Sequence, residues 1–437
     1  MEGYIEPRVL KGFRDSLPEA EAAKSRLIAI LEKSFRLFGF VPIDTPVLEY
    51  SEILLGKGGG ETEKQVYRFF DHGDRDVVMR YDLTVPFARF MASHHSKLYL
   101  PFKRYHIAKV WRGENTQRGR YREFMQCDFD IVGTDSTSAD FEILLVMAKS
   151  IQALGIDRFR IHYSHRATIN RLLKRLGLEE KSVEILRIVD KLQKAGIQKT
   201  ESQLAAITDE KKIKSILNFI TVEESTEDTL TKLEVEAGGQ GEDTIRLKQI
   251  AKLIAELKLE EFFLLDPSIT RGLDYYTGLV YETYLSEQSE LGSICSGGRY
   301  NNLASLYTDE KIPGVGSSIG LDRLMTAMER IDKSGNPESR RALLILCMNE
   351  AYLGYYHTLA STLRDAGITT EVYPEKKKLA RQFKYADKKK YAFALICGED
   401  ERKKGTVTLK DLQTRESYED LTPKDVEITI DRLVVSP

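Results

Sequence analysis

The sequence predicts a chain of mixed helices and strands in three parts, and three observations support this prediction. Residues 102–133 read as two strands joined by a polar loop, and the second strand alternates apolar and polar residues. Residues 164–261 contain a single aromatic residue, Phe219, and no proline, while their apolar residues recur at helical spacing. From residue 341 onward, short strands and helices alternate, which is typical of an α/β unit.

The overall composition is that of a globular protein of about three domains by length. The chain has 437 residues, 42% of them hydrophobic, with 65 Lys and Arg against 67 Asp and Glu, a net charge of −2. This balance excludes a strongly basic coat for nucleic acid, but not a local basic patch. No long apolar run, no signal-peptide pattern and no C-x-x-C pair occurs. We therefore expect a reduced, cytoplasmic protein without a membrane span.

The first element is predicted to be an amphipathic helix. Ser16 stands where an N-cap is expected, Pro18 suits the first turn, and Gly39 suits the end of the helix. Pro42 and Pro46 punctuate the extended segment that follows. Because proline cannot donate to the hydrogen-bond ladder of a sheet, we expect this segment to be an edge or interface strand.

The second strand of the 102–133 pair carries its polar groups on one face. Alternation places an amide and two carboxylates, those of Gln126, Asp128 and Asp130, on the same side as Phe124. The opposite side is expected to pack against the core. Its residues are Met125, Cys127, Phe129 and Ile131.

Composition also predicts where the parts of the chain begin and end. We expect residues 1–164 and 262–331 to form one domain, interrupted by a helical insertion at 165–261. A polar linker at 332–338 precedes the α/β unit, which we place at 341–437 and expect to contain a largely parallel sheet. Its expected strands are 342–348, 369–373, 391–397 and 406–411, and its expected helices are 350–366 and 379–389.

Common nucleotide-binding and hydrolase signatures are missing, but four clusters of arginine, glycine, aromatic and acidic residues remain. No P-loop, H-E-x-x-H or G-x-S-x-G pattern occurs, and the glycines of 314–320 have the wrong spacing for a dinucleotide loop. The first cluster, residues 112–124, contains four arginines, whose forked side chains suit phosphate oxygens. The others are 271–278, with adjacent tyrosines, 296–300, with adjacent glycines, and 314–325, where a glycine-bearing strand meets a helix.

Each cluster also has a purely structural interpretation. The arginine-rich segment fits a solvated hairpin tip, although the polar strand face that follows it favours a binding site. The adjacent tyrosines fit a core, and the last cluster fits a helix packed closely on a sheet. The paired glycines fit a plain turn or a backbone that approaches a ligand closely. None of the four decides between these interpretations by itself.

Taken together, the clusters resemble the histidyl-tRNA synthetase family of class II aminoacyl-tRNA synthetases over nearly the whole chain. Residues 12–15 with the next helix and strand resemble motif 1, residues 112–130 motif 2, and residues 314–324 motif 3. Residues 271–276 (Arg-Gly-Leu-Asp-Tyr-Tyr) and 296–300 resemble two peptides particular to the histidine enzymes. The resemblance implies an α+β catalytic domain with an antiparallel sheet, a helical insertion and a C-terminal α/β anticodon-binding domain. It also implies a homodimer with motif 1 in the interface.

The activity implied by the resemblance is ATP-dependent ligation of L-histidine to tRNA(His) through a histidyl-adenylate, which releases pyrophosphate and AMP. Arg112 and Arg271 are the implied catalytic residues, because each would bring positive charge to the α-phosphate. Phe124 and Arg323 would lie on the two faces of adenine, and Arg120 would reach the γ-phosphate. The implied ATP-binding residues are Arg112, Glu114, Arg120, Phe124 and Arg323. ATP implies Mg²⁺ with phosphate and water as its main ligands, and no metal site made by the protein itself.

The implied histidine site must satisfy an ammonium group, a carboxylate and two ring nitrogens. Asp82, Thr84 and Gln126 match the pocket for the amino group, while Asp130 and Tyr276 match the partners of the imidazole. Such a site rejects apolar analogues because its polar groups would be left unpaired. The histidine-binding residues implied by the resemblance are Asp82, Thr84, Arg112, Gln126, Asp130, Arg271, Tyr275, Tyr276 and Tyr300.

Contacts to tRNA are implied in two places. Gln117 and Arg118 in the motif 2 loop are candidates for the acceptor end, and residues 376–404 carry eleven Lys and Arg against four Asp and Glu. Two related alternatives remain: a non-catalytic regulatory subunit of ATP phosphoribosyltransferase, and a tRNA-sensing module. The first typically lacks the C-terminal unit and a complete 271–276 peptide, and the second usually has degenerate motifs, whereas this chain has intact versions of all of these.

Overall fold

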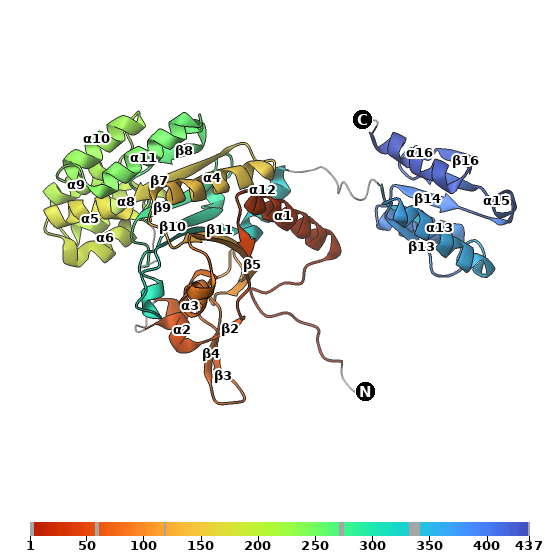
Figure 1. The fold of residues 1–437 in the computed structure, drawn as a ribbon, viewed down its shortest axis with the longest axis horizontal. Coiled ribbons are helices and arrows are strands. Elements are labelled where there is room, and N and C mark those ends of the chain that lie inside the picture. The colour runs from red at the N-terminus through yellow and green to blue at the C-terminus, as the bar shows by residue number, and fades with distance from the viewer. Residues whose placement is uncertain (1–3, 57–60, 118, 271–274, 332–340, 436–437) are drawn as a thin grey trace. The chain divides into compact units, whose positions relative to one another are not determined.

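Two units, residues 1–331 and 332–437, make up the chain, and each has a sheet of its own (Figure 1). Among the helices in the described part of the chain, none combines the length and the apolar character needed to cross a membrane. The computed structural model describes residues 4–56, 61–117, 119–270, 275–331 and 341–435.

An eight-stranded sheet forms the body of the first unit, with the strand order β1-β5-β6-β11-β10-β9-β7-β8. Neighbouring strands from β5 to β7 are antiparallel, and the outer pairs β1–β5 and β7–β8 are parallel. The segment predicted to be an edge strand is β1, which lies at one edge. The strands are β1 (Val41–Pro42), β5 (Phe102–Trp111), β6 (Glu123–Val132), β7 (Phe159–His165), β8 (Phe263–Leu265), β9 (Leu279–Leu285), β10 (Cys295–Arg299) and β11 (Gly314–Gly320).

Three helices cover one face of this sheet, namely α1 (Pro18–Leu37), α4 (Thr137–Ala153) and α12 (Leu321–Ile331). Phe35 of α1 packs on Phe129 of β6, with 4.9 Å between the ring centroids. The apolar side of β6 belongs to this core, as its alternation predicts. The polar side of β6 therefore points to the opposite face of the sheet.

The start of α1 differs from the prediction. The helix begins at Pro18 with the extended Leu17 as its N-cap and no side-chain cap. Proline disfavours a helical conformation in the residue before it, so the helix cannot begin earlier. Ser16 instead hydrogen-bonds the Glu21 side chain. The end of the helix agrees with the prediction, because Gly39 follows it with a φ of 79° and bonds back to the last turn.

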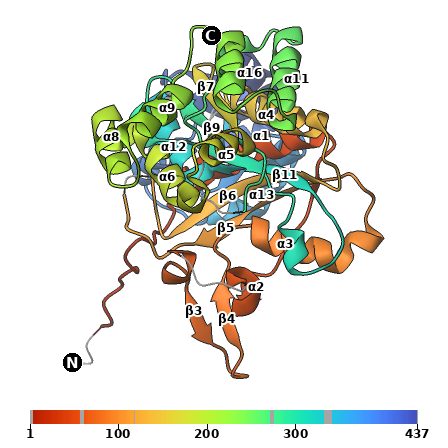
Figure 2. The same ribbon diagram turned by 90° about the vertical axis from the view of Figure 1, so that its left-hand side faces the viewer.

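The second face of the sheet is covered in part by α3 (Thr84–His94), whose Phe87 and Met91 pack with Tyr276 and Tyr300. A small antiparallel sheet with the order β2-β4-β3 lies nearby, and Figure 2 shows β3 and β4 projecting from the unit. These elements are β2 (Leu48–Tyr50), α2 (Ser51–Leu55), β3 (Arg68–Phe70) and β4 (Asp76–Met79).

The segment 165–261 is helical, as predicted, and its core is continuous with the cluster under the sheet. The domain boundaries drawn around it from the sequence stay a prediction. The helices are α5 (Arg166–Arg175), α6 (Ser182–Val189), α7 (Leu192–Ala195), α8 (Ile197–Ala205), α9 (Glu210–Ile220), α10 (Thr226–Glu236) and α11 (Glu242–Glu256). The short 3-10 helices of the first unit are η1 (Glu61–Lys64), η2 (His95–Lys97), η3 (Glu179–Lys181), η4 (Glu260–Phe262), η5 (Ser289–Leu291) and η6 (Ala304–Leu306).

The second unit contains a five-stranded sheet with the order β13-β12-β14-β15-β16 around an apolar core. Its strands are β12 (Leu343–Ile345), β13 (Thr370–Val372), β14 (Phe393–Ile396), β15 (Val407–Asp411) and β16 (Ser417–Leu421). Its helices are η8 (Glu350–Tyr352), α13 (Leu353–Asp365), α14 (Leu379–Lys388), α15 (Glu399–Lys404) and α16 (Pro423–Val435).

The prediction of a largely parallel sheet is only half right for this unit. β12 pairs in parallel with β13 and β14, but β14–β15 and β15–β16 are antiparallel. A parallel crossover needs about a dozen residues or more, and the connections after β14 and β15 are shorter than this. The sequence analysis also missed α15, β16 and α16.

Candidate active site

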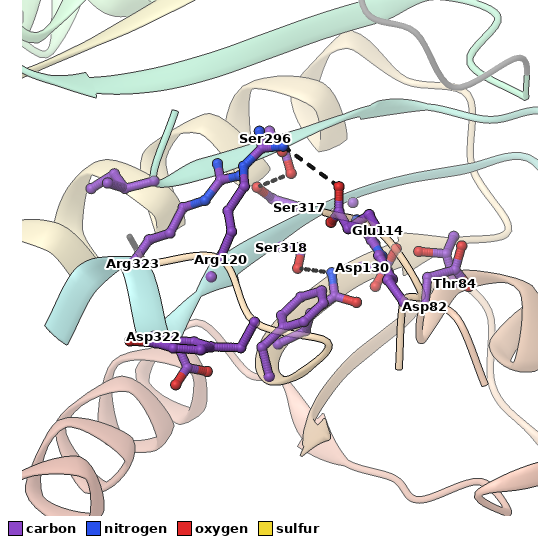
Figure 3. Close-up of a pocket in the computed structure, with 18 of the residues that line it drawn as sticks. Asp82, Thr84, Glu114, Arg120, Asp130, Ser296, Ser317, Ser318, Asp322 and Arg323 are labelled. Carbon is purple, nitrogen blue, oxygen red and sulfur yellow. Dashed lines mark hydrogen bonds and ion pairs between the residues drawn. The ribbon is translucent and has the colours of Figure 1, made fainter. Parts of the chain in front are cut away.

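A polar pocket of about 220 Å³ lies on the face of the large sheet opposite α1 and α4 (Figure 3). Strands β6, β10 and β11, the loop before β6 and the start of α3 supply most of its walls. Its lining residues include Asp82, Thr84, Arg112, Glu114, Arg120, Phe124, Gln126, Asp130, Tyr275, Tyr276, Ser296, Tyr300, Ser318, Asp322 and Arg323.

A buried ion pair forms the floor of this pocket. Asp130 on β6 lies opposite Arg104 on β5, and the Arg104 Nη2 and Asp130 Oδ2 atoms are 2.7 Å apart. Arg104 is fully buried, and its guanidinium lies 4.1 Å from the ring centroid of Phe87. Burial raises the pKa of Asp130, and the positive charge of Arg104 opposes this shift. The pair therefore supplies a carboxylate whose counter-charge comes from the protein.

Tyr300 completes the environment of Asp130 from the neighbouring part of the sheet. Its hydroxyl donates to Asp130 Oδ1 at 2.5 Å. Burial raises the pKa of Tyr300 well above its usual value, so the phenol remains a donor. A Cβ on Gly316 would lie 1.8 Å from Asp130 Oδ1, so the carboxylate requires glycine at this position.

The paired glycines of β10 do not leave the backbone open toward the pocket. A Cβ on Gly298 would lie 2.7 Å from the Tyr276 ring, and a Cβ on Gly297 would lie 2.1 Å from the carbonyl oxygen of Gly316. The glycines thus allow close contact within the protein, between strands and with a tyrosine of the pocket. The alternative that they approach a ligand directly is not what this geometry shows.

Asp82 and Arg112 form a second charged region of the pocket. Asp82 is 6% exposed and accepts a hydrogen bond from the Val85 amide at 3.0 Å. Burial raises the pKa of Asp82, against the opposing effects of backbone hydrogen bonds and Arg112. Arg112 Nε donates to the Tyr81 carbonyl at 3.1 Å, and its guanidinium lies 5.1 Å from the centroid of Phe124. These contacts fix a cation beside a buried carboxylate.

Two further arginines lie at one side of the pocket. Figure 3 shows the side chains of Arg120 and Arg323 running alongside each other. Arg120 forms an ion pair with Glu114 at 3.6 Å, and Arg323 donates to the Ser293 carbonyl at 2.6 Å. Positive charge grouped in this way suits an anionic ligand with several oxygens.

The structure brings together twelve of the residues predicted from the sequence. Gln117 is exposed in the 112–122 loop, where it pairs with Arg120 through the backbone, and it does not line the pocket. Arg118 and Arg271 lie outside the described residues. The twelve that line the pocket are Asp82, Thr84, Arg112, Glu114, Arg120, Phe124, Gln126, Asp130, Tyr275, Tyr276, Tyr300 and Arg323.

The sequence analysis missed Arg104, Ser318 and Asp322. Asp322 accepts from the Met125 amide at 2.8 Å and forms an ion pair with Arg14, which explains how the N-terminal motif reaches the pocket. A signal for Arg104 was present, because a buried carboxylate on β6 needs a cation on an adjacent strand. In the part of the chain that the structure describes, no group of three or more His, Cys, Asp or Glu is arranged to hold a metal ion.

The second unit carries a basic surface on and around α14. Arg381, Lys384 and Lys388 are exposed at helical spacing. Lys389 differs, because its Nζ lies 2.6 Å from Glu371 Oε2 and 5.2 Å from the ring centroid of Tyr391. Arg381, Lys384 and Lys388 are therefore better candidates for contact with phosphate than the paired Lys389.

The antiparallel sheet with this pocket, followed by a separate α/β unit, is the fold of the class II aminoacyl-tRNA synthetases. The family model for histidyl-tRNA synthetase matches residues 12–324, and the model for the anticodon binding domain matches residues 342–434. The chain belongs to the histidyl-tRNA synthetase family. The family and the fold class predicted from the sequence are both confirmed.

Relatives and solved structures resemble the chain over nearly its whole length. The histidine–tRNA ligase of Treponema denticola is 50% identical and covers 97% of each chain, and that of Rhodopirellula baltica is 46% identical and covers 95% of each. The crystal structure of histidyl-tRNA synthetase from Nostoc sp. PCC 7120 has a TM-score of 0.87 at 31% identity, covering 98% of this chain and 100% of that one. A Bacillus halodurans structure named as an ATP phosphoribosyltransferase regulatory subunit/histidyl-tRNA synthetase has a TM-score of 0.75 at 21% identity and shares the fold.

Proposed function

We propose that this chain ligates L-histidine to tRNA(His) in two steps, through a histidyl-adenylate. The observation that carries the proposal is the single pocket that combines a buried Asp130–Arg104–Tyr300 floor with the separate cations Arg112 and Arg120. The regulatory-subunit alternative has less support, because the near full-length relatives are named histidine–tRNA ligases and the anticodon-binding unit is present.

Histidine is proposed to bind at the buried end of the pocket. The ammonium group would meet Asp82, Thr84 and Gln126, whose oxygens can accept its protons. The imidazole would meet Asp130 and Tyr276, with Tyr275 and Tyr300 beside it. The Asp130 carboxylate already has two protein partners, so it has less capacity to accept from the ligand than an unpaired carboxylate would have.

ATP is proposed to bind along the arginines. Adenine would stack between Phe124 and Arg323 with Glu114 near its amino group, and Arg120 would meet the γ-phosphate. Arg112 would contact both the α-phosphate and the histidine carboxylate. A carboxylate oxygen then attacks the α-phosphorus, the bond to the bridging oxygen breaks, and pyrophosphate leaves with that electron pair.

Charge stabilisation would come from Arg112 and, on the other side of the α-phosphate, from Arg271, which lies outside the described residues. Mg²⁺ would accompany ATP, held by phosphate oxygens and water. In the second step, a ribose hydroxyl of the terminal adenosine attacks the histidyl carbonyl carbon, and AMP leaves. Gln117 and Arg118 are proposed to contact the acceptor end of the tRNA.

The remaining parts of the chain are proposed to serve tRNA and dimer contacts. The unit at 341–437 would bind the anticodon region, and the insertion at 165–261 would contact the acceptor stem. Exposed apolar residues such as Leu48 and Phe70 on the small sheet support a homodimer with motif 1 in the interface. A cytoplasmic location is part of the same proposal.

The test is histidine-dependent exchange of pyrophosphate into ATP, without tRNA. We expect robust exchange for the wild type with histidine and not with other amino acids, and a loss of at least a thousandfold in Arg112→Ala and Arg271→Ala. The matched control is Arg158→Ala, because Arg158 forms an exposed ion pair with Glu287 outside the pocket. Exchange that survives in Arg112→Ala would remove that residue from its proposed role. No exchange in a folded wild type would favour the regulatory or tRNA-sensing alternatives.

A further inference from the structure

Three polar side chains lie together at one side of the pocket, Gln126 and Asp128 on β6 and Ser318 on β11. Gln126 Nε2 donates to Ser318 Oγ at 2.7 Å, and the nearby Ser318 hydroxyl opposes the rise in the pKa of Asp128 as a hydrogen-bonding group. Ser318 and Asp128 are direct cross-strand partners, so their side chains point to the same face of the sheet. In Figure 3 a dashed line marks the hydrogen bond of Ser318 at the side of the cavity.

The Gln126 amide is satisfied on its nitrogen but not on its oxygen. Gln126 is 8% exposed, and its Oε1 atom is buried without a hydrogen-bond partner in the described part of the protein. Leaving a buried amide oxygen unpaired costs free energy, and it is typical of a group that a ligand will satisfy. Gln126 lines the pocket, so a small movement of its side chain would present this buried oxygen to a donor bound there.

The order of donors and acceptors explains why the oxygen, and not the nitrogen, is left over. An ionised carboxylate can only accept hydrogen bonds. Ser318 has one hydroxyl proton, so when it donates that proton to Asp128 it can only accept from Gln126. The amide must then turn its nitrogen toward Ser318 and its oxygen away. Neither Asp128 nor Ser318 is needed for binding in any other role given above.

Asp128 is a buried carboxyl group whose protonation state would decide whether it accepts from Ser318 or donates to it. It is 2% exposed, its Oδ1 atom has no partner in the described region, and it does not line the pocket. Burial raises its pKa to about 7, with Arg104 opposing and Asp130 reinforcing the shift. The charged and titratable groups that face it from β5, from β6 and from the segment before α3 are Arg104, His106, Asp130, Arg80 and Asp82.

We propose that Asp128, acting through Ser318, is a positioning residue that orients the Gln126 amide so that its oxygen accepts from the α-ammonium group of the substrate amino acid. The proposal rests on the proposed function and adds to it the origin of selectivity for a charged amino group. A protonated Asp128 could donate to Ser318, which would free the hydroxyl to donate to the amide oxygen. The amide nitrogen would then face the ammonium group, and binding would weaken.

The test measures histidine binding directly, by calorimetry, beside its KM in exchange. Ser318→Ala is expected to weaken histidine binding by about tenfold or more, because a bond to a charged group loses its oriented acceptor. Imidazolepropionate, which is histidine without its amino group, should bind wild type and variant within about twofold, as should ATP. Ser318→Thr keeps the hydroxyl and should restore most of the histidine affinity. Ser150→Ala removes a buried serine pair on the opposite face of the sheet and is the control.

The pH dependence gives a second readout. Asp128→Asn offers Ser318 a donor and an acceptor alike, so it should weaken histidine binding at pH 8. Wild type and Asp128→Asn should converge toward pH 6, where the wild-type acid is protonated, whereas a merely structural role would give a constant difference.

Three outcomes would overturn the proposal. One is unchanged histidine binding in Ser318→Ala, a second is equal loss for histidine and imidazolepropionate, and a third is no rescue by Ser318→Thr. Histidine binding without any exchange in the wild type would contradict the proposed function but would still test the amide orientation. Absence of histidine binding in the folded wild type would overturn both.

Discussion

Two buried glutamines, one in each unit, show how differently the two sheets treat polar groups. Gln382 in the second unit is fully buried, and its amide bonds the Cys347 amide at 2.8 Å and the carbonyls of Cys347 and Lys377 at 2.9 Å. Gln126 in the first unit bonds Ser318 once and leaves its oxygen without a partner in the described structure. The Gln382 amide satisfies backbone groups of the protein, whereas the Gln126 oxygen is left for the proposed ligand.

The same contrast extends to charge. The large sheet buries Arg104, Asp128 and Asp130 side by side, whereas Asp411, at 9% exposed, is the one buried charged residue in the described part of the second unit. Charges packed in this way cost stability unless they are paired, and they are typical of functional sites. The comparison therefore predicts that substitutions of these polar groups in the first unit will impair histidine-dependent exchange, and that substitutions in the second unit will leave exchange unchanged.

The largest effect is expected for Arg104→Ala. This change leaves the Asp130 carboxylate buried without its counter-charge, so the free energy of unfolding of the first unit should fall by about 3–5 kcal/mol. Histidine-dependent exchange should fall at least a hundredfold, because the floor of the pocket loses its geometry. Chemical denaturation and exchange rates on the same preparation measure both.

A double variant distinguishes the two consequences of that change. Replacing the pair with apolar residues, as in Arg104→Met with Asp130→Leu, removes both buried charges and should recover most of the lost stability. It should not recover exchange, because the proposed imidazole partner is gone. Wild-type exchange in the double variant would show that the pair is structural and that the proposed histidine site is wrong.

A second prediction concerns the pH dependence of stability in the first unit. His165 is 8% exposed, and burial lowers its pKa to about 4. The unfolded chain, with a histidine pKa of about 6.5, binds the proton more readily, so this residue lowers stability as the pH falls from about 6.5 to 4. The loss should reach about 2 kcal/mol by pH 5.

The variant His165→Asn tests this assignment. Asparagine also suits the N-cap position that His165 occupies before α5, but it does not titrate. The difference in stability between variant and wild type should therefore change in favour of the variant between pH 7 and pH 5. A constant difference would contradict the lowered pKa. Comparing the two proteins at each pH also cancels the opposite contributions of buried carboxylates such as Asp82.

The third prediction concerns the two glutamines, and its expected effect on stability is of intermediate size. Gln382→Ala leaves the backbone groups of Cys347 unpaired and should cost about 1–3 kcal/mol in unfolding of the second unit, with tRNA-independent exchange unchanged. Gln126→Ala removes one bond and an unsatisfied oxygen, so it should cost less than about 1 kcal/mol but raise the KM for histidine. Equal effects of both variants on stability would remove the distinction between the two amides.

The sequence predicted those parts of the site that depend on one strand alone and missed those that depend on the pairing of strands. Alternation along β6 correctly placed Gln126 and Asp130 on the pocket face, because period-two patterns depend on one strand alone. Arg104 was missed because its place opposite Asp130 depends on the register of β5 against β6. A long connecting loop does not specify that register, whereas a two-residue turn would.

For the fold as well, the sequence predicted local elements better than it predicted how those elements pair. Local sequence patterns predicted the helical insertion, and they also predicted two helices and four strands of the second unit. The direction of β15 depends on whether its connection is long enough for a crossover, and the helix α15 within that connection was not recognised. Leu17, rather than Ser16, is the N-cap of α1, because Pro18 restricts the conformation of the residue before it, and this constraint outweighs the preference of serine for the cap.

The smallest effect is expected for two lysines of the second unit. They allow a comparison, on the surface, of an ammonium group that has a partner within the protein with one that is open to a ligand. Lys384 on α14 and Lys389 are both exposed, but Lys389 forms an ion pair with Glu371. Lys384→Ala should raise the KM for tRNA a few-fold and reduce the slope of log affinity against log salt by roughly one, the value for a lost phosphate contact. Lys389→Ala should leave that slope unchanged, because the ammonium group is already neutralised within the protein. If both variants reduced the slope equally, the Glu371 pair would not persist when tRNA binds, and a group that is satisfied in the free protein would be as available to a ligand as one that is open.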